Sequence, residues 1–376
     1  MTKTNIPFVD LGAQYKRFRT EILETFDRVS STGHYVFGPE VSQFEQAFAR
    51  YCEVPYALGV ANGSDALYLA MRALNIGEGD EVITAPNSFI ASAWTIAHTG
   101  AKVRFADVGW DMNLDPSKIQ DAITPQTKAI MPVHFTGRIA DMDLITDIAK
   151  ANNLYVIEDA AQAVGARYKG KVSGSFGDAA GFSLHPLKNL HVHGDGGVMV
   201  TPHESVRVLV EKWRNHGLAN RDECEFWGIN SRLDAIQAAI VNIKLRHLDT
   251  INNDFVKLAK NYISELSDVV VTPNVKEHEQ PIYHRFMIRH QERDALQAYL
   301  ASVGVETKVN YPIPIHLQPA AQNLGYKKGD FPVAELLADS ILSLPIYAEM
   351  PETDQQYVIE HIRQFAKRNH CKLHVY

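Results

Sequence analysis

Short apolar runs alternate with helical patterns from about residue 56 to residue 200, and this alternation constrains the fold more than any other feature. The runs at 56–60, 81–84, 102–106, 128–133 and 154–157 are expected to be strands, and the segments 64–74, 89–98, 116–123 and 142–151 the helices between them. Strands connected through helices pair in parallel. The pattern therefore predicts an α/β fold with a largely parallel sheet covered on both faces.

The regular alternation of strands and helices ends in the second half of the chain. Segments 179–183 and 198–201 are expected to be further strands joined by a short turn, and 231–247 and 254–266 two long helices in tandem. A strand at 283–289 and helices at 294–303 and 353–367 follow. Helices at 15–30 and 40–52 form an N-terminal arm that completes the core. We expect a large domain over 1–245 and a smaller C-terminal α/β domain over 246–376.

Charge and cysteine content restrict the class of protein. The 376 residues carry a net charge of -7 at pH 7, which argues against a nucleic-acid-binding or polybasic membrane surface. Cys52, Cys224 and Cys371 are too few and too widely spaced for a disulfide framework or a zinc pattern. The N-terminus lacks an apolar signal core, and no apolar run approaches the ~20 residues of a membrane span. We expect a soluble cytoplasmic protein.

One lysine stands out from the others. Lys188 follows Pro186, is flanked by Leu187 and Leu190, and precedes the glycine-rich segment 194–197, which lets backbone approach a ligand closely. Most lysines are solvated surface residues, but these neighbours indicate a partly buried amine with a lowered pKa and improved nucleophilicity.

A carboxylate and a hydroxyl group precede this lysine in the chain. Asp159 ends the most apolar predicted strand, and Ser183 ends another. A site for pyridoxal phosphate (PLP) needs this ordered set. The lysine forms a Schiff base with the PLP aldehyde, the carboxylate pairs with the protonated pyridine nitrogen, and the serine hydroxyl binds the phosphate.

Some of these positions have a structural alternative. Gly63, Ser64 and Asp65 open a helix after a strand, where backbone N–H groups bind anions, but Ser and Asp are also preferred N-cap residues. Asp159 could likewise cap a helix over 160–164. Gln162, one helical turn further on, could then hydrogen-bond a ring hydroxyl group.

Several other side chains are candidates. Phe89 is either core or a ring that stacks on a cofactor, and His185 is a packing or active-site histidine beside Lys188. Tyr311 and His316 lie in a proline-held turn, which makes a rigid presenting loop. The spacing of the histidines around Lys188 matches no known short metal-binding pattern, so we expect no metal.

Taken in order, these segments resemble the PLP-dependent sugar aminotransferases of the DegT/DnrJ/EryC1/StrS family. The matching segments span nearly the whole chain and lie at 8–11, 37–40, 60–67, 158–162, 183–188, 194–197, 230–232 and 311–316. The resemblance implies the aspartate-aminotransferase-like fold of PLP-dependent transferases (fold type I), with a mostly parallel mixed sheet. It also implies a homodimer whose active sites lie between the subunits.

The resemblance also assigns residue roles. It implies that Lys188 is the Schiff-base lysine and that Asp159 is the partner of the pyridinium nitrogen. The other cofactor-binding residues that it implies are Gly63, Ser64, Asp65, Phe89, Gln162, Ser183 and, from the second subunit, Asn230. The substrate-binding residues that it implies are His185, Arg232, Tyr311 and His316. Two of the implied residues have a structural alternative: Asn230 could cap a helix, and Arg232 could be an ordinary surface arginine.

The implied reaction is transfer of an amino group from an amino donor, L-glutamate by resemblance, to a keto nucleotide sugar. The segment 311–319 is most similar to enzymes that act on 3-keto sugars, which favours a 3-keto-6-deoxyhexose on dTDP. The alternatives are a 4-keto or UDP-linked sugar, a PLP-dependent nucleotide-sugar dehydratase, and a PLP-bound sensor without activity. The dehydratases of the family carry histidine in place of the lysine, so Lys188 favours amino transfer.

Overall fold

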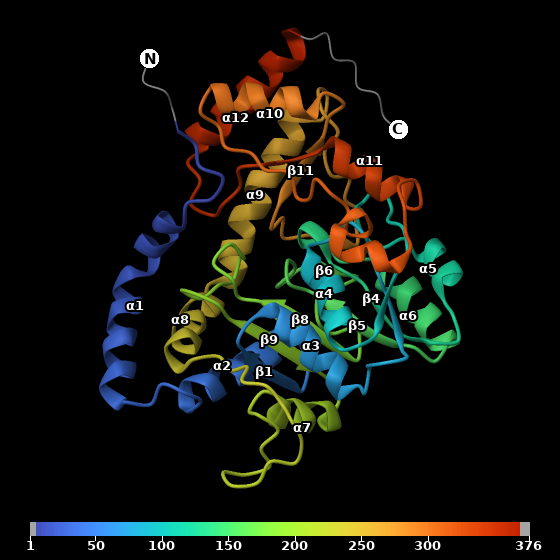
Figure 1. The fold of residues 1–376 in the computed structure, drawn as a ribbon. Helices are drawn as coiled ribbons and strands as arrows, with labels where there is room; N and C mark the ends of the chain where they lie inside the picture. The colour runs from blue at the N-terminus through green and yellow to red at the C-terminus, as the bar shows by residue number, and fades with distance from the viewer. Residues whose placement is uncertain (1–4, 369–376) are drawn as a thin grey trace.

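A seven-stranded sheet forms the centre of the computed structural model, which describes residues 5–368 (Figure 1). The strand order is β1-β9-β8-β5-β4-β2-β3, and every pair from β8 to β3 is parallel, whereas β9 runs antiparallel to both β1 and β8. The strands are β1 (Tyr56–Val60), β2 (Glu81–Thr84), β3 (Lys102–Phe105), β4 (Thr127–Met131), β5 (Tyr155–Asp159), β8 (Ala179–Ser183) and β9 (Gly197–Thr201).

Both faces of the sheet are covered. Successive residues of a strand point to opposite faces, and yet every residue of β2 and of β9 is buried. Helix α3 packs on β8 and β9, α6 on β4 and β5, and α7 on β1 and β9. The helices of this part are α2 (Pro39–Tyr51), α3 (Gly63–Ala73), α4 (Ile90–His98), α5 (Pro116–Ala122), α6 (Met142–Ala151), α7 (Glu204–Trp213) and α8 (Ala235–Arg246), with a 3-10 turn η1 (Phe135–Gly137).

The pairing pattern brings several strand ends to one edge of the sheet. Strands β1, β2, β4, β5 and β8 share one direction, so their carboxyl ends meet there, and β9 begins at the same edge. Ligands of α/β proteins bind beyond this edge, because the loops that leave it spread apart and the adjoining helices begin there.

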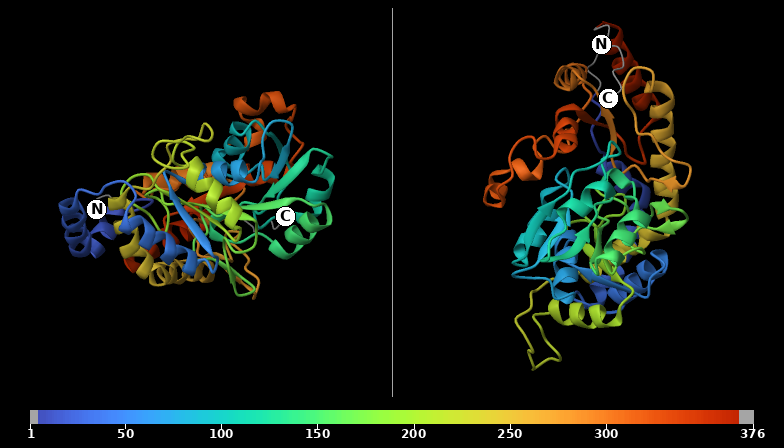
Figure 2. Two further views of the ribbon diagram at one scale, coloured as in Figure 1. Left: turned by 90° about the horizontal axis from the view of Figure 1, so that it is seen from below. Right: turned by 90° about the vertical axis from the view of Figure 1, so that its right-hand side faces the viewer.

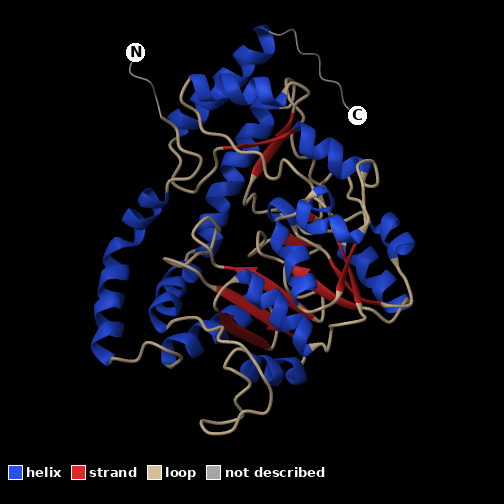
Figure 3. Cartoon of the chain, viewed as in Figure 1, coloured by secondary structure: helices blue, strands red, loops and turns tan. Residues whose placement is uncertain are grey.

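The C-terminal elements lie at the end of the molecule away from α7 (Figure 2, right). They include a separate two-stranded sheet (Figure 3). They are α9 (Leu248–Leu266), β11 (Phe286–Arg289), α10 (Arg293–Ser302), η2 (Ile315–Leu317), η3 (Pro319–Leu324), α11 (Pro332–Ser340), β12 (Ile341–Leu344) and α12 (Glu352–Arg368). A third small sheet joins β6 (Arg167–Tyr168), β7 (Lys171–Val172) and β10 (Glu279–Gln280).

Two large clusters of buried side chains hold these parts together, and neither is confined to one stretch of sequence. Ile6, together with Phe18 of α1 (Leu11–Thr32), packs in the cluster built mainly by the C-terminal elements. Ile315 and Phe331 pack in the cluster of the central sheet. The division at residue 245, next to the junction of α8 and α9, therefore remains a proposal about folding units.

Most expected elements of the first half form within a few residues of their predicted bounds, but four details were wrong. Strands β8 and β9 are joined by the long loop 184–196 rather than a short turn. Residues 160–164 form turns instead of a helix. Helix α8 begins at Ala235, and α9 follows it after His247 alone. Helices α7 and α11 were not predicted.

No helix among the described residues is both long enough and apolar enough to span a bilayer. Cys371 lies outside the described part of the chain. Cys52 is buried and Cys224 exposed, and both are free thiols.

Candidate active site

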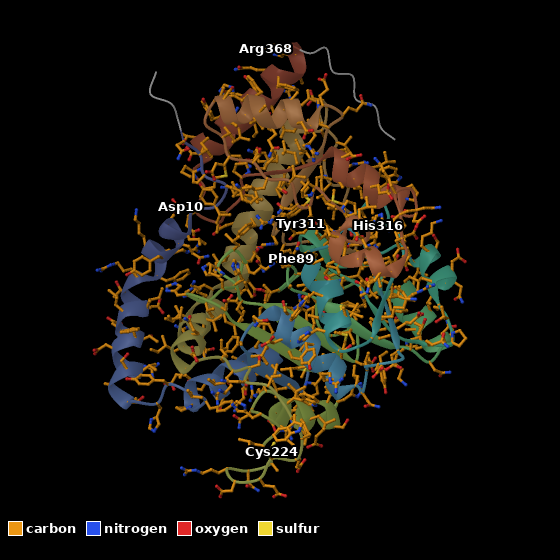
Figure 4. All side chains as sticks on the ribbon, viewed as in Figure 1. Asp10, Phe89, Cys224, Tyr311, His316 and Arg368 are labelled. Atoms are coloured by element: carbon orange, nitrogen blue, oxygen red, sulfur yellow. The ribbon has the colours of Figure 1, made fainter. Side chains whose placement is uncertain are left out.

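A cavity of about 570 Å³ lies over the carboxyl edge of the central sheet. All the predicted site residues except Asn230, Arg232 and His316 line it. Figure 4 labels Tyr311 just above Phe89, between the sheet and the C-terminal elements, and their ring centroids are 5.6 Å apart. The lining residues that come from the predictions are Gly63, Ser64, Asp65, Phe89, Asp159, Gln162, Ser183, His185, Lys188 and Tyr311.

Asp159 is the buried carboxylate of this cavity, and only 5% of its surface is exposed. Its Oδ2 accepts a hydrogen bond from the Ser92 hydroxyl (2.6 Å), and its Oδ1 accepts one from the Ala161 N–H (3.2 Å). Burial raises the pKa of Asp159, and these hydrogen bonds oppose that change. A helix N-cap role is wrong, because no helix follows.

Glu158 precedes Asp159 and serves a different purpose. Its carboxylate is fully buried and accepts hydrogen bonds from the N–H groups of Gly174, Phe176 and Gly177 at 2.8–2.9 Å. The His134 ring lies 2.9 Å from it. Because neighbours on a strand point to opposite faces, Glu158 stabilises the loop 174–177 while Asp159 faces the cavity.

Lys188 lies in the loop 184–196, and neighbouring groups hold its backbone. Its N–H donates to the His185 carbonyl (2.9 Å), and its own carbonyl accepts from Nδ1 of His191 (2.8 Å). The Asn189 amide donates to Oδ1 of Asn252 on α9 (3.0 Å). The loop is thus fixed at both ends of the lysine, and the side chain enters the cavity.

The charge state of the Lys188 amine is set by its surroundings. Burial, which disfavours the charged form, and the positive charge of Arg285 together lower the pKa of Lys188 to about 8, although Asp159 opposes both. An appreciable fraction of the amine is therefore neutral near pH 7, as a nucleophile must be.

The first turn of α3 forms the opposite wall of the cavity. Asn62, which the sequence analysis passed over, is the N-cap: its Oδ1 accepts from the Asp65 N–H at 2.8 Å. The capping interpretation of Ser64 and Asp65 is therefore wrong. A Cβ on Gly63 would come within 2.8 Å of the Cβ of Ser183, so glycine allows the helix start and the end of β8 to meet.

Two further side chains complete the wall near Lys188. Oε1 of Gln162 accepts from the Thr136 N–H (2.9 Å), which leaves its NH₂ group as a donor. Burial raises the pKa of Tyr311, so its hydroxyl stays protonated. Ser92 and Arg285 also line the cavity, and no motif in the sequence pointed to either.

Three predicted residues lie elsewhere in this chain. His316 is 2% exposed, and its Nε2 lies 3.0 Å from Glu335, so its imidazole contacts α11 instead of the cavity. Asn230 is exposed, and Arg232 donates to Asn215 (3.3 Å) and lies over the Phe37 ring. Within residues 5–368 no group of three or more His, Cys, Asp or Glu side chains is arranged to hold a metal.

Comparisons with known proteins agree with this geometry. The model of the DegT/DnrJ/EryC1/StrS aminotransferase family matches residues 16–363. The chain is 42% identical to a dTDP-3-amino-3,6-dideoxy-alpha-D-galactopyranose transaminase of Aneurinibacillus thermoaerophilus, covering 96% of this chain and 99% of that one. It is also 42% identical to a protein of Geobacillus stearothermophilus named as a pleiotropic regulatory protein, covering 96% of this chain and 98% of the relative.

A solved structure is similar to this chain over nearly its whole length. The S. venezuelae protein DesV, in complex with a ketimine intermediate, superposes with a TM-score of 0.95 at 40% identity, covering 97% of this chain and 99% of DesV. The fold is therefore the aspartate-aminotransferase-like fold type I that the sequence resemblance implied. The chain belongs to the DegT/DnrJ/EryC1/StrS aminotransferase family.

Proposed function

We propose that this aminotransferase moves an amino group from an α-amino acid, L-glutamate, to a keto nucleotide sugar, with a 3-keto-6-deoxyhexose on dTDP as acceptor. The observation that carries the proposal is the meeting of the Lys188 amine and the Asp159 carboxylate in one cavity beside the start of α3. The similarity to a transaminase of a dTDP-linked 3-amino sugar supports the choice of acceptor.

The cavity residues fit PLP. Asp159 is a buried carboxylate without a cationic partner among the described residues, which a protonated ring nitrogen would supply. Gly63, Ser64 and Ser183 form a cradle of N–H and O–H donors at a helix start, which suits a phosphate dianion. When bound, PLP supplies an aldehyde for the amine and a ring that takes up negative charge.

Lys188 is the residue that moves protons in this scheme. Once its amine is free and neutral, it takes the proton from the donor α-carbon, and it later returns a proton to the sugar carbon that gains nitrogen. The donor leaves as 2-oxoglutarate before the sugar enters, so ping-pong kinetics are expected. Phe89 and Tyr311 line the cavity beside these atoms.

The second subunit of a homodimer would complete each site. The segment between α7 and α8 projects from the body of the molecule, and Figure 4 labels Cys224 near its tip. Trp227 in this segment is 91% exposed, and an indole this exposed is typical of a surface that another chain covers. We therefore assign Asn230 to the phosphate of the partner's cofactor and Arg232 to its substrate, in a cytoplasmic enzyme.

The pKa of Lys188 leads to a prediction for the cofactor-free enzyme. Because only the neutral amine attacks the PLP aldehyde, the rate of covalent PLP capture should rise with pH, with a midpoint at about 8. Stopped-flow absorbance between about pH 6 and pH 11.5 measures this rate. A midpoint near 10.5, the ordinary value for lysine, would show that the amine is solvated rather than buried.

A nitrogen-tracing experiment tests the proposed reaction. The PLP-loaded enzyme is given ¹⁵N-labelled L-glutamate and, in turn, 3-keto and 4-keto sugars on dTDP and on UDP, and products are identified by mass and NMR. We expect a ¹⁵N-amino sugar from the dTDP-linked 3-keto substrate, with equimolar 2-oxoglutarate. A sugar that loses water and gains no ¹⁵N would indicate a dehydratase, and no reaction with any acceptor would favour the sensor.

A further inference from the structure

We propose that Arg285 binds the α-carboxylate of the amino donor and thereby selects α-amino acids over simple amines. This inference rests on the proposed function and adds to it a residue that recognises one of the two substrates, the amino donor. Arg285 is the only arginine among the described residues that line the cavity.

The position of Arg285 is fixed by segments far apart in the sequence. It directly precedes β11, and its N–H donates to the carbonyl of Thr136 in η1 (3.4 Å). Its guanidinium carbon lies 4.9 Å from the centroid of the Phe8 ring, in the N-terminal segment. The aromatic face covers one side of the guanidinium group and leaves its N–H edge available to the cavity.

Arg285 is half-buried, and it has no ion-pair partner among the described residues. Among the described residues, the buried arginines Arg138, Arg214 and Arg293 each contact a carboxylate: Glu279, Glu45 and Asp294, respectively. No described carboxylate lies within ion-pair distance of Arg285. Burial lowers the pKa of its guanidinium group, as expected for a cation that has lost water without gaining an anion.

The anion that fits must lie close to the reacting atoms. Arg285 is near enough to the Lys188 amine and to Tyr311 for its charge to act on both: it helps burial to lower the pKa of Lys188, and it opposes the larger effect of burial that raises the pKa of Tyr311. The α-carboxylate of an amino acid is bonded to the carbon from which Lys188 takes a proton, so it necessarily enters this region. A planar guanidinium binds a carboxylate through two parallel hydrogen bonds.

The other anions of the reaction belong elsewhere. The cofactor phosphate is assigned to the start of α3, and the diphosphate of a nucleotide sugar is separated from the keto carbon by the sugar ring. The keto carbon itself carries no charge. Replacing Arg285 should therefore slow the half-reaction with the amino donor and leave the rate of the half-reaction with the sugar acceptor nearly unchanged.

The test compares Arg285→Gln with Arg289→Gln in the PLP-loaded enzyme. Arg289 is a matched control, because it lies at the other end of β11, with its guanidinium 4.8 Å from the Trp110 ring, and it does not line the cavity. Single-turnover kinetics should show kcat/KM for L-glutamate reduced by about 10- to 150-fold in Arg285→Gln, the effect of losing a charged hydrogen-bonded pair. Arg289→Gln should behave as wild type, and Arg285→Lys should fall between.

Three further readouts separate a carboxylate-binding role from general damage. The rate with 4-aminobutyrate, a donor without an α-carboxylate, should be the same in wild type and Arg285→Gln. The acceptor half, started from enzyme already carrying the amino group, should change less than about threefold. Glutarate binding by calorimetry, which needs no turnover, should weaken at least tenfold in Arg285→Gln alone.

The outcomes distinguish this inference from the proposed function. If wild type transfers nitrogen from glutamate and Arg285→Gln does so equally well, the role of Arg285 is wrong and the proposed function stands. Equal losses with glutamate and 4-aminobutyrate would also overturn it. If wild type does not react with glutamate, the proposed function fails, and unchanged glutarate binding in Arg285→Gln would still count against the carboxylate site.

Discussion

Replacing Lys188 with alanine should lower the rate of amino transfer by about 10²- to 10⁴-fold, the range for losing a positioned group that takes or gives a proton. Among residues 5–368, the change removes the only lysine that lines the cavity. Activity is measured as 2-oxoglutarate formed from L-glutamate. The variant should still bind PLP through the phosphate cradle, but without a covalent bond.

The folded structure should tolerate this change. The Lys188 amine makes no hydrogen bond or ion pair with another described side chain, and the contacts that hold the loop come from its backbone and from Asn189. The melting temperature of Lys188→Ala should therefore equal or exceed that of wild type. Added methylamine should restore part of the activity, because it replaces the missing amine.

A second lysine provides the matched control. Lys244 on α8 is fully buried, and burial lowers its pKa to about 7, but it lies outside the cavity. Lys244→Met removes the charge and keeps an unbranched side chain that is only one atom shorter, and it should retain activity. If Lys188→Ala kept more than a tenth of wild-type activity, the assignment of the reactive amine would be wrong.

Asp159→Asn should reduce the turnover rate by about 10²- to 10³-fold, as expected when a preorganised charge is removed from a water-poor site. Asparagine has the shape of aspartate and can still contact Ser92 and Ala161. It cannot hold a proton on the ring nitrogen of the cofactor. The loss should therefore appear in both half-reactions, unlike that of Arg285→Gln, which is confined to the donor.

Glu158→Gln is the control for a buried carboxylate on the same strand. It weakens the three N–H contacts to the loop 174–177, and each lost charged hydrogen bond costs about 1.5–3 kcal/mol of unfolding free energy. We expect a lower midpoint in urea and near-normal turnover in the enzyme that remains folded. Asp159→Asn with turnover within fivefold of wild type would contradict its role at the ring nitrogen.

The central sheet and most cavity residues were predictable because both depend on local sequence patterns. Alternating apolar runs and helices define a parallel sheet, and residues at strand ends are then brought to one edge by topology alone. Asp159, Ser183 and Gly63 reach the cavity for this reason. Helix α11 could also have been found, because Pro332 at its first turn is a known helix-start signal.

Contacts between distant segments could not be predicted in the same way. Arg285 reaches the cavity because the C-terminal elements pack over the sheet edge, and nothing near residue 285 signals this. Ser92 lies inside the apolar helix α4, where a serine has no distinctive pattern. The proline-held turn before His316 was recognisable, but a turn does not determine side-chain direction, and the imidazole lies inward against Glu335.

Peptide mapping after borohydride reduction tests the central claim most directly. The purified protein is incubated with PLP, reduced, digested with a protease and analysed by mass spectrometry. We predict that the phosphopyridoxyl group is found on Lys188, and that prior addition of L-glutamate removes the modification. Phosphopyridoxyl label spread over exposed lysines, with Lys188 unmodified, would contradict the account.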